Sequence, residues 1–295
     1  MAACLLAIVT AGMPSDPRLM VGTQLARDIL DRTAVRAASF LAATGAKPCL
    51  AAVMVGDDPA SVTYVRMKRN RCRDAGIDSR LVGLPAATTT ASLVAAIAEL
   101  SGDPSVHGIL LQHPSPPHID ERAAFEAIDP AKDVDGVTMH SFAAMGFGYP
   151  GFASCTPGGI IRLLDHYGVS LAGMHAVVIG RSPILGKPVG MMLLARDATV
   201  TFCHSRTVSL PSVVGTADII VAAVGRPNFV RGDWVRPGAV VVDAGYNEGN
   251  IGDVAFDEVV GHASLITPVP GGVGPMTIAV LLEQTVDAAL MVRTV

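Results

Sequence analysis

Short apolar runs alternate with longer segments of helical periodicity along almost the whole sequence. Strands that are apolar on both faces and alternate with amphipathic helices are typical of a parallel sheet covered by helices on both sides. The fold class is therefore expected to be α/β. In the first half, the pattern predicts strands at Cys49–Val55, Ser79–Leu84 and Val106–Leu111, and helices at Leu25–Leu41, Ser61–Ala75, Thr90–Leu100 and Arg122–Ile128.

The alternation is interrupted over Gly146–Pro157, where glycine, proline and aromatic residues replace the regular pattern. A chain of 295 residues has room for two domains of about 150 residues each, so this stretch is the expected linker. The sequence thus predicts two α/β domains. In the second half, helices are expected at Pro157–His166, Leu185–Ala195 and Met276–Met291, and strands at His175–Ile179, Thr199–Phe202, Asp218–Val224 and Ala239–Asp243.

The composition excludes several classes of protein. Half of the residues are hydrophobic, 16% are charged and the formal net charge is −4, so neither a disordered chain nor a nucleic-acid partner is expected. The five cysteines are scattered and odd in number, and neither they nor the eight histidines have the spacing of a metal site. Reduced thiols are therefore expected, as in a cytoplasmic protein without a bound metal.

The N-terminal segment Ala2–Ala11 is apolar enough to be mistaken for an export signal. It lacks the Lys or Arg residues with which a signal peptide begins, and it is too short to span a bilayer. No other run reaches a transmembrane length without a charge, a glycine or a proline. We expect a soluble protein with no membrane partner, whose first residues are an extension or the product of an early start site, Met13 and Met20 being alternative starts.

The loop after the expected strand at Ala176–Gly180 has features of a nucleotide site. Glycines at 180, 186 and 190 flank the start of a helix, where free backbone N–H groups attract anions. The spacing differs from the dinucleotide-binding GxGxxG pattern, so an ordinary connection between a strand and a helix stays open as an alternative.

The end of the next expected strand indicates which dinucleotide would bind. An NAD-specific site places Asp or Glu there to hold the ribose 2′-hydroxyl. This strand instead runs into Cys203-His204-Ser205-Arg206, which offers a hydroxyl and cations but no carboxylate, and Arg181 can reach the same position. The pattern favours NADP, with a solvated loop as the alternative. The candidate cofactor-binding residues are Gly180, Arg181, Ser182, Ser205 and Arg206.

The first half of the chain contains a candidate catalytic set. Ser61, Tyr64 and Lys68 share one face of an expected helix, and a buried Lys beside polar groups can have its pKa lowered enough to transfer protons. Gln112 follows a strand end, where ligands lie in open α/β sheets. Asp135, in the loop Lys132–Gly136, can present a carboxylate to a ring that carries N–H groups. A solvated helix face and an ordinary acidic turn are the alternatives.

Taken together, these segments resemble one known family, the bifunctional methylenetetrahydrofolate dehydrogenase/methenyltetrahydrofolate cyclohydrolases. The resemblance extends from about residue 19 to residue 289, in the family's order. It rests on seven blocks: VGDDPASVTYVRMKRNRC (55–72), GILLQHPSPPHID (108–120), KDVDG (132–136), CTPGG (155–159), VVIGRSPILGKPVGMMLL (177–194), TVTFCHSRT (199–207) and TPVPGGVGPMT (267–277).

The resemblance implies a domain organisation and an oligomeric state. A folate-binding catalytic domain is implied for residues 18–149 and 275–295, because in this family the last helix packs back onto the first domain. A Rossmann-like NADP-binding domain is implied for residues 150–274, and residues 1–17 are an extension without a family counterpart. Pairs of cofactor domains are implied to form a homodimer.

The resemblance also implies roles for the candidate residues. Tyr64 would line the folate pocket, Asp135 would hold the pterin ring, and Lys68, tuned by Gln112, would manage protons and the attacking water. Arg181 and Ser205 match positions that hold the 2′-phosphate. The loop Pro268–Pro275 would lie near the nicotinamide. Its candidate substrate contacts are Gly271, Gly272 and Thr277, with a tight turn before the last helix as the alternative.

The implied activity is the oxidation of 5,10-methylenetetrahydrofolate by NADP⁺, followed by hydrolysis of the methenyl product to 10-formyltetrahydrofolate. The alternatives are a member with one activity, a catalytically inactive protein that binds NADP and folate, and an unrelated dehydrogenase resembling shikimate dehydrogenase. His113 stands where the family usually has an apolar residue, so an effect on folate affinity or pH dependence is expected there. The stretch Asn247–Asp253 is also shorter than in many members.

Overall fold

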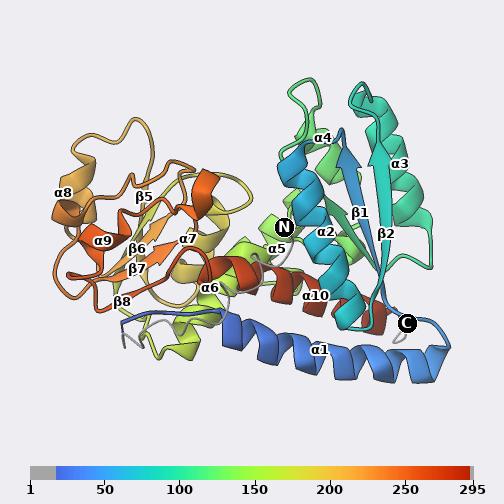
Figure 1. Cartoon of the computed structure of the whole chain (residues 1–295), viewed down its shortest axis with the longest axis horizontal. Coiled ribbons are helices and arrows are strands. Elements are labelled where there is room, and N and C mark those ends of the chain that lie inside the picture. Colours follow the sequence, from blue (N-terminus) through green and yellow to red (C-terminus); the bar gives the residue numbers. More distant parts are fainter. Residues whose placement is uncertain (1–17, 293–295) are drawn as a thin grey trace, which may run out of the picture.

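The structure, a computed structural model, describes residues 18–292, without the side chains of residues 59–62 and 64. Two lobes lie side by side, each built on a parallel sheet, and long helices run beneath them (Figure 1). The two-domain α/β organisation expected from the alternating pattern is therefore confirmed.

The first lobe has a three-stranded sheet in the order β2-β1-β3, with all strands parallel. The central strand β1 and its neighbour β3 are almost wholly buried, which explains why they are continuous apolar runs. Thr89 caps α3, its side chain accepting the backbone N–H of Ser92 at 3.2 Å. The elements are α1 (Thr23–Thr44), β1 (Cys49–Val55), α2 (Pro59–Asp74), β2 (Asp78–Leu84), α3 (Thr90–Gly102), β3 (Gly108–Leu111), α4 (Glu121–Glu126) and α5 (Met139–Phe147).

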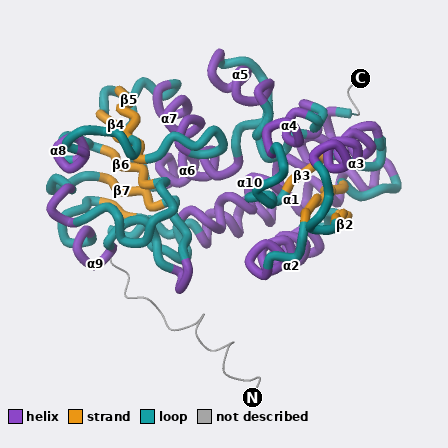
Figure 2. Tube along the Cα trace, turned by 90° about the horizontal axis from the view of Figure 1, so that it is seen from above, coloured by secondary structure: helices purple, strands orange, loops and turns teal. Residues whose placement is uncertain are grey.

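The second lobe has a five-stranded parallel sheet in the order β5-β4-β6-β7-β8. Helices α6 and α7 lie on one side of the strands, and α8 and α9 on the other (Figure 2). Successive side chains of a strand pack on opposite faces of the sheet. Val178 packs in the core under α6 and α7, whereas Val177 packs in the core on the other face. The elements are α6 (Cys155–His166), β4 (His175–Ile179), α7 (Gly186–Leu194), β5 (Thr199–Cys203), α8 (Leu210–Val214), β6 (Ile219–Ala222), β7 (Val240–Asp243), α9 (Phe256–Val259) and β8 (Leu265–Ile266).

Helix α10 (Val273–Met291) leaves the second lobe and runs beneath the first (Figure 1). Its residues Leu282 and Val286 share a buried core with Leu50 of β1 and Leu110 of β3, so it covers one face of the first sheet. Helix α1 packs on it as well, through Ile29. Within residues 18–292, α10 is the helix long and apolar enough to cross a bilayer, and two thirds of its apolar window, 67%, is buried inside the protein. Packing against the two lobes thus accounts for its composition.

The structure also contains elements that the apolar pattern did not predict. Helix α5 precedes the expected linker, and only its last two residues, Gly146 and Phe147, lie inside the linker. Helices α8 and α9 and strand β8 are too short to give a periodic signal, as are the 3₁₀ turns at Pro130–Lys132, Gly232–Trp234 and Glu248–Asn250.

Helix α6 contributes to the cores of both lobes. Cys155, in its first turn, packs in the core beneath the first sheet, whereas Ile160 and Leu164 pack against the second sheet. The division of the domains at residues 149/150 and 274/275 therefore stays a prediction. The N-terminal extension lies outside the described residues.

Candidate active site

A polar pair marks the carboxyl end of the first sheet, between β1 and β3. Gln112 directly follows β3, and its backbone N–H bonds to the Val53 carbonyl at 2.8 Å. Lys68 comes from α2, the helix that follows β1, and its Nζ donates to Gln112 Oε1 at 3.3 Å. In a sheet of order β2-β1-β3, this is the point where the chain connections diverge and where ligands bind. The structure thus brings together the two residues that the sequence expected to interact, and their catalytic roles stay predictions.

The orientation of this pair is fixed on both sides. The Gln112 amide donates through Nε2 to the His113 carbonyl at 2.9 Å, which turns its oxygen toward Lys68. Lys68 is only 6% exposed and Gln112 only 9%. The His113 ring packs edge-on against Phe125. A buried amine held by a neutral acceptor is a suitable proton-transfer group.

Burial sets the electrostatics of Lys68. Loss of hydration disfavours the ammonium form and lowers the pKa of Lys68, while the nearby Asp135 carboxylate opposes that shift. The same desolvation raises the pKa of the Cys155 thiol well above its ordinary value, so this neighbour of Lys68 stays a thiol. Lys68 is therefore neutral more readily than an exposed lysine is.

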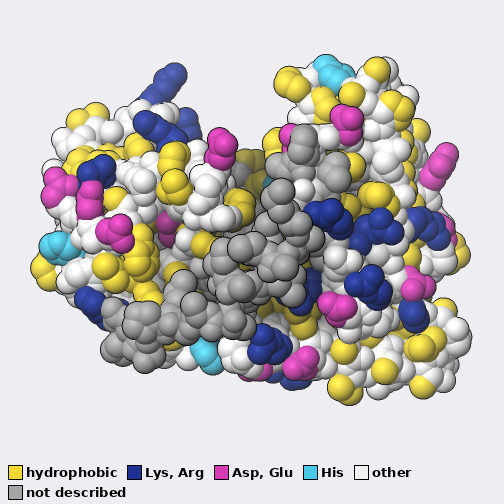
Figure 3. All heavy atoms as spheres, in the orientation of Figure 1, with side chains coloured by type: hydrophobic (Ala, Val, Ile, Leu, Met, Phe, Trp, Pro, Cys, Tyr) yellow, Lys and Arg dark blue, Asp and Glu magenta, His cyan; other side chains and the backbone are white. Residues whose placement is uncertain are grey.

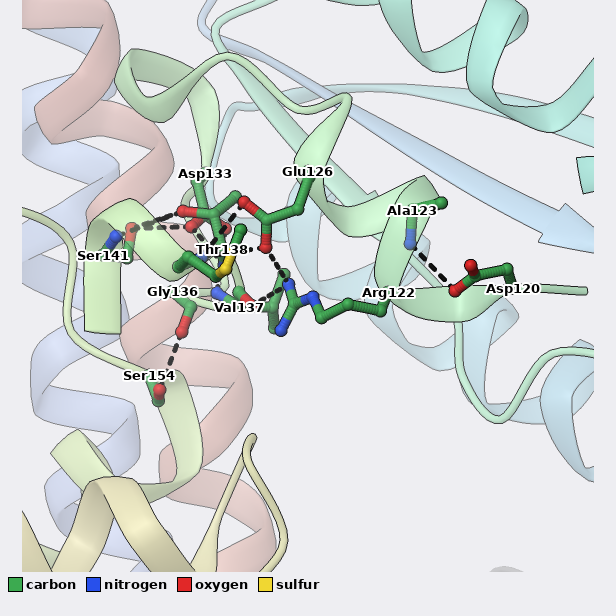
Figure 4. Close-up of polar contacts among 11 residues, drawn as sticks. Asp120, Arg122, Ala123, Glu126, Asp133, Gly136, Val137, Thr138, Ser141 and Ser154 are labelled. Carbon is green, nitrogen blue, oxygen red and sulfur yellow. Dashed lines mark hydrogen bonds and ion pairs between the residues drawn. The ribbon is translucent and has the colours of Figure 1, made fainter. Parts of the chain in front are cut away.

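The loop that contains Asp135 is organised by a different carboxylate (Figure 4). Asp133 is fully buried and accepts the backbone N–H groups of Val137 and Thr138 at 3.0 and 2.9 Å and the Ser141 hydroxyl at 2.6 Å. Burial raises the pKa of Asp133, and these hydrogen bonds oppose the rise. Asp135, two residues on, is half-buried and lies close enough to Lys68 and Cys155 to act on both electrostatically. One carboxylate of the KDVDG block thus builds the loop, and the other lies near Lys68.

Contacts on both sides of Gly136 hold the loop in place. Gly136 has φ of 66°, and a Cβ there would overlap the backbone of Ala153. Its carbonyl accepts the Ser154 hydroxyl at 2.7 Å, and Arg122 Nη2 donates to the Val137 carbonyl at 2.6 Å (Figure 4). The glycine is required because two backbone segments approach closely.

Gln284 of α10 is a supporting residue that the sequence did not indicate. Its Nε2 donates to the Val134 carbonyl at 2.7 Å and to the Ala153 carbonyl at 3.0 Å. It ties the last helix to the loop that carries Asp135, across 150 residues of sequence. One polar residue among several in a mainly apolar helix gives no local signal for such a contact.

In the second lobe, the loop after β4 lies at the corresponding point of the sheet, between β4 and β6. Gly180 has φ of 129°, and a Cβ there would overlap the Ala223 carbonyl of the neighbouring loop. A Cβ at Gly186 would meet the Gly180 carbonyl, and one at Gly190 would overlap the Phe202 ring. The three glycines thus permit the tight turn and the close packing of α7 on the sheet that a dinucleotide loop needs.

The candidate 2′-phosphate contacts follow two neighbouring strands, β4 and β5. Arg181, Ser205 and Arg206 are exposed, and Ser182 Oγ accepts the Ile184 N–H at 3.3 Å. No carboxylate follows β5 before Asp218, so nothing there would repel a phosphate. Basic side chains project from the upper edge of the second lobe, and the surface is hollowed between the lobes (Figure 3). This donor set fits NADP. The individual contacts stay predictions.

The remaining candidates lie in or near the turn before α10. Gly271 has φ of 105°, and its carbonyl accepts the Gly22 N–H at 2.9 Å. Gly272 donates to the Pro268 carbonyl at 2.9 Å, and the Thr277 and Thr156 hydroxyls are 3.0 Å apart. The Gly272–Pro268 bond closes a tight turn before α10, and contact of these residues with substrate stays a prediction. Tyr64 belongs to α2, but its side chain is outside the described part.

Fold and sites together define the class of protein. It is a two-domain NAD(P)-dependent enzyme, with the dinucleotide loop in the second lobe and a proton-transfer group in the first. Comparison with known families gives the particular assignment. Residues 20–135 match the tetrahydrofolate dehydrogenase/cyclohydrolase catalytic domain, and residues 154–293 match the NAD(P)-binding domain of the same family. The chain belongs to the tetrahydrofolate dehydrogenase/cyclohydrolase family, as the seven blocks predicted, and the alternative of an unrelated shikimate dehydrogenase-like enzyme is wrong.

Individual relatives agree with this assignment. The bifunctional protein FolD 1 of Streptomyces avermitilis is 71% identical over 272 residues, 92% of this chain and 95% of the relative. The crystal structure of the bifunctional FolD enzyme from Campylobacter jejuni is 44% identical, with a TM-score of 0.89 over 92% of this chain and 98% of that one. The Trypanosoma brucei enzyme, complexed with NADP cofactor and inhibitor, is 34% identical, with a TM-score of 0.90 over 94% of this chain and 98% of that one.

No group of three or more His, Cys, Asp or Glu side chains could hold a metal ion within the described residues. The four cysteines in that part of the chain, Cys49, Cys72, Cys155 and Cys203, are buried free thiols.

Proposed function

We propose that this chain oxidises 5,10-methylenetetrahydrofolate with NADP⁺ and hydrolyses the resulting 5,10-methenyltetrahydrofolate to 10-formyltetrahydrofolate. The observation that carries the proposal is the buried Lys68–Gln112 pair beside Asp135, at the carboxyl end of the first sheet. Family membership supplies the substrate class, and the side-chain geometry supports both reactions rather than one.

In the first reaction, the two lobes bring substrate and cofactor together. Asp135 would accept N–H groups of the pterin ring and so fix the one-carbon bridge in the first lobe. Bound NADP⁺ supplies a hydride acceptor, and the hydride leaves the bridge carbon of the substrate as the methenyl cation forms. Since this step releases no proton from the bridge to a base, Lys68 contributes by orienting the substrate.

In the second reaction, water adds to the methenyl carbon and the ring opens. The added water loses both of its protons in the overall reaction: one is gained by the ring nitrogen whose bond to the one-carbon unit breaks, and the other is released to solvent. Lys68 is suited to both transfers because burial lowers the pKa of its amine, while Gln112 holds the amine in place. The Asp135 carboxylate favours the protonated amine, so protonation of Lys68 after proton transfer from water is not prohibitively costly.

NADP is the proposed cofactor rather than NAD. The loop after β5 carries Ser205 and Arg206, and Arg181 follows β4, so a 2′-phosphate would meet cations and a hydroxyl with no carboxylate nearby. NAD would lack the phosphate that these groups are suited to bind.

The test follows NADPH formation and the methenyl chromophore together, with purified protein, 5,10-methylenetetrahydrofolate and NADP⁺. NADPH formation with little methenyl accumulation, together with hydrolysis of added methenyltetrahydrofolate above the spontaneous rate, is expected. NADPH formation with stoichiometric methenyl accumulation would mean a dehydrogenase only. Binding of both ligands without turnover would mean an inactive protein, and absence of NADPH would contradict the cofactor assignment.

We also propose that the chain acts as a cytoplasmic homodimer. Strand β5 is an edge strand of the second sheet, and exposed apolar side chains lie on or beside it: Leu194, Phe202 and Val208. An edge strand with apolar neighbours is suited to pair with a second copy. Light scattering after size exclusion is expected to give twice the mass of 30.4 kDa, and Phe202→Glu to shift it toward the monomer.

A further inference from the structure

A buried carboxylate holds the loop that follows β6. Asp253 is wholly buried, and its Oδ2 accepts the backbone N–H groups of Val224 and Gly225 at 2.6 and 2.8 Å. Its Oδ1 accepts the N–H of Arg226 at 2.9 Å, as well as the Asn247 side-chain amide at 3.1 Å. Three consecutive backbone donors thus converge on one side chain, which fixes the path of the loop.

A second carboxylate fixes the first. Asp243, at the end of β7, accepts the backbone N–H of Asp253 through Oδ1 at 2.9 Å and that of Val254 through Oδ2 at 2.9 Å. Glycines make room for both carboxylates, since a Cβ at Gly252 would overlap Asp243 Oδ2 and one at Gly245 would overlap the Asp253 carboxylate. The two aspartates therefore connect β7 to the loop after β6 through two successive sets of hydrogen bonds.

The loop held in this way borders the dinucleotide site. Ala223, its first residue, bonds through its N–H to the Ile179 carbonyl at 2.8 Å, and a Cβ at Gly180 would overlap the Ala223 carbonyl. The loop and the glycine turn after β4 are thus in contact at the point where β4 and β6 diverge. Ligands of such sheets bind there, so a displacement of residues 224–226 would change the wall of the site.

We propose that Asp253 is a positioning residue for the cofactor: it holds the loop Val224–Arg226 against the Gly180 turn and thereby sets the affinity for NADP. A carboxylate is suited to this role because both of its oxygens accept only. Asparagine has the same shape but offers one acceptor oxygen, and its NH₂ group would face backbone donors.

This inference rests on the proposed function and predicts a separation of the two activities. The loop lies in the second lobe, whereas Lys68 and Gln112 lie in the first. Loosening the loop should therefore weaken NADP binding and raise its KM, while hydrolysis of added methenyltetrahydrofolate, which consumes no cofactor, should continue. A carboxylate that only stabilises the fold would not discriminate between the two ligands in the folded protein.

The test compares Asp253→Asn with Asp257→Asn, which removes the same charge from an exposed position on α9. Binding of NADP⁺ is measured by calorimetry, and methenyl hydrolysis by loss of chromophore. In Asp253→Asn, the dissociation constant for NADP⁺ should rise by at least about tenfold, as expected when charge-assisted hydrogen bonds are lost, with the hydrolysis kcat within about twofold of the parent. Asp257→Asn should change neither quantity.

Gly225→Ala keeps the test informative should Asp253→Asn fail to fold. Gly225 has φ of 65° and open space around the missing Cβ, so alanine strains the same loop without displacing a neighbour. It should weaken NADP⁺ binding in the same direction. Unchanged NADP⁺ affinity in a folded variant, or an equal loss of hydrolysis, would overturn the inference. A parent protein that binds NADP⁺ but neither oxidises methylenetetrahydrofolate nor hydrolyses methenyltetrahydrofolate would contradict the proposed function. The inference about NADP⁺ affinity would still stand.

Discussion

The Lys68 amine and the Gln112 carboxamide oxygen lie 3.3 Å apart, at the carboxyl end of the first sheet. One residue comes from the helix after β1 and the other from the end of β3, so the parallel sheet brings together groups that are 44 positions apart in sequence. A neutral partner supports the amine without adding a charge that would favour protonation. The pair can therefore exchange protons at a pH where an exposed lysine would stay charged.

Replacing Lys68 with methionine should separate the two reactions. Lys68→Met removes the proton-transfer group but keeps an unbranched chain of similar length in the buried site. Hydrolysis of methenyltetrahydrofolate should fall by about 10²–10⁴-fold, the usual contribution of a general acid–base group. Hydride transfer needs no base and should retain measurable activity, seen as NADPH formation with methenyl accumulation. Equal loss of both activities in a folded variant that binds folate would contradict this division of roles.

Gln112→Glu should move the pH profile of hydrolysis to higher pH. A carboxylate at this position would stabilise the ammonium form and raise the pKa of Lys68, opposing the lowering caused by burial. The rate of methenyl hydrolysis, corrected for the spontaneous reaction, should therefore reach its plateau at a higher pH than in the parent. Gln112→Leu removes the acceptor without adding charge and serves as the matched variant, whose profile should not move upward. A common profile for the parent and Gln112→Glu would show that Lys68 does not titrate in this step.

The sequence predicted the parts of this site that depend on regular elements. Strand β3 is a buried apolar run, so its end, and with it Gln112, could be located, and helical spacing indicated which residues share a face with Lys68. The residues that hold the loops could not be found in this way. Asp133 and Asp253 accept backbone N–H groups of irregular segments, and Gln284 contacts a loop 150 residues away. Such contacts depend on tertiary structure and leave no periodic pattern.

The rim arginines should determine the choice between NADP and NAD. Arg181→Ala removes a cation from the exposed rim of the β4 loop, where the 2′-phosphate is expected. Its loss should raise the KM for NADP⁺ by about tenfold, in line with one charge-assisted contact, and leave the KM for NAD⁺ within about twofold. Lys187→Ala, also exposed on the adjoining helix, is the control. Steady-state kinetics with both dinucleotides measure the effect, and a parallel rise in both KM values would contradict the assignment.

The buried Asp243 should make stability depend on pH in an unusual direction. Burial raises the pKa of Asp243 from 3.8 to about 6, so the folded protein holds this proton more tightly than the unfolded chain does. The stabilisation from protonated Asp243 is complete below about pH 4 and is lost as the pH rises through about 6, a change on the order of 3 kcal/mol. Asp243→Asn cannot titrate, so the free energy of unfolding of the parent minus that of the variant should fall between pH 4.5 and about pH 7.

Urea denaturation at several pH values measures this difference, and subtracting the two curves removes the contributions of all other carboxylates. Asp257→Asn is the matched control, because it makes the same substitution at an exposed side chain. A flat difference for Asp243→Asn would mean that the backbone N–H groups of Gly245, Asp253 and Val254 stabilise the carboxylate enough to cancel the cost of its burial. Whether this difference falls with pH or stays flat thus decides which effect dominates at Asp243, the cost of burying the carboxylate or its stabilisation by backbone N–H groups.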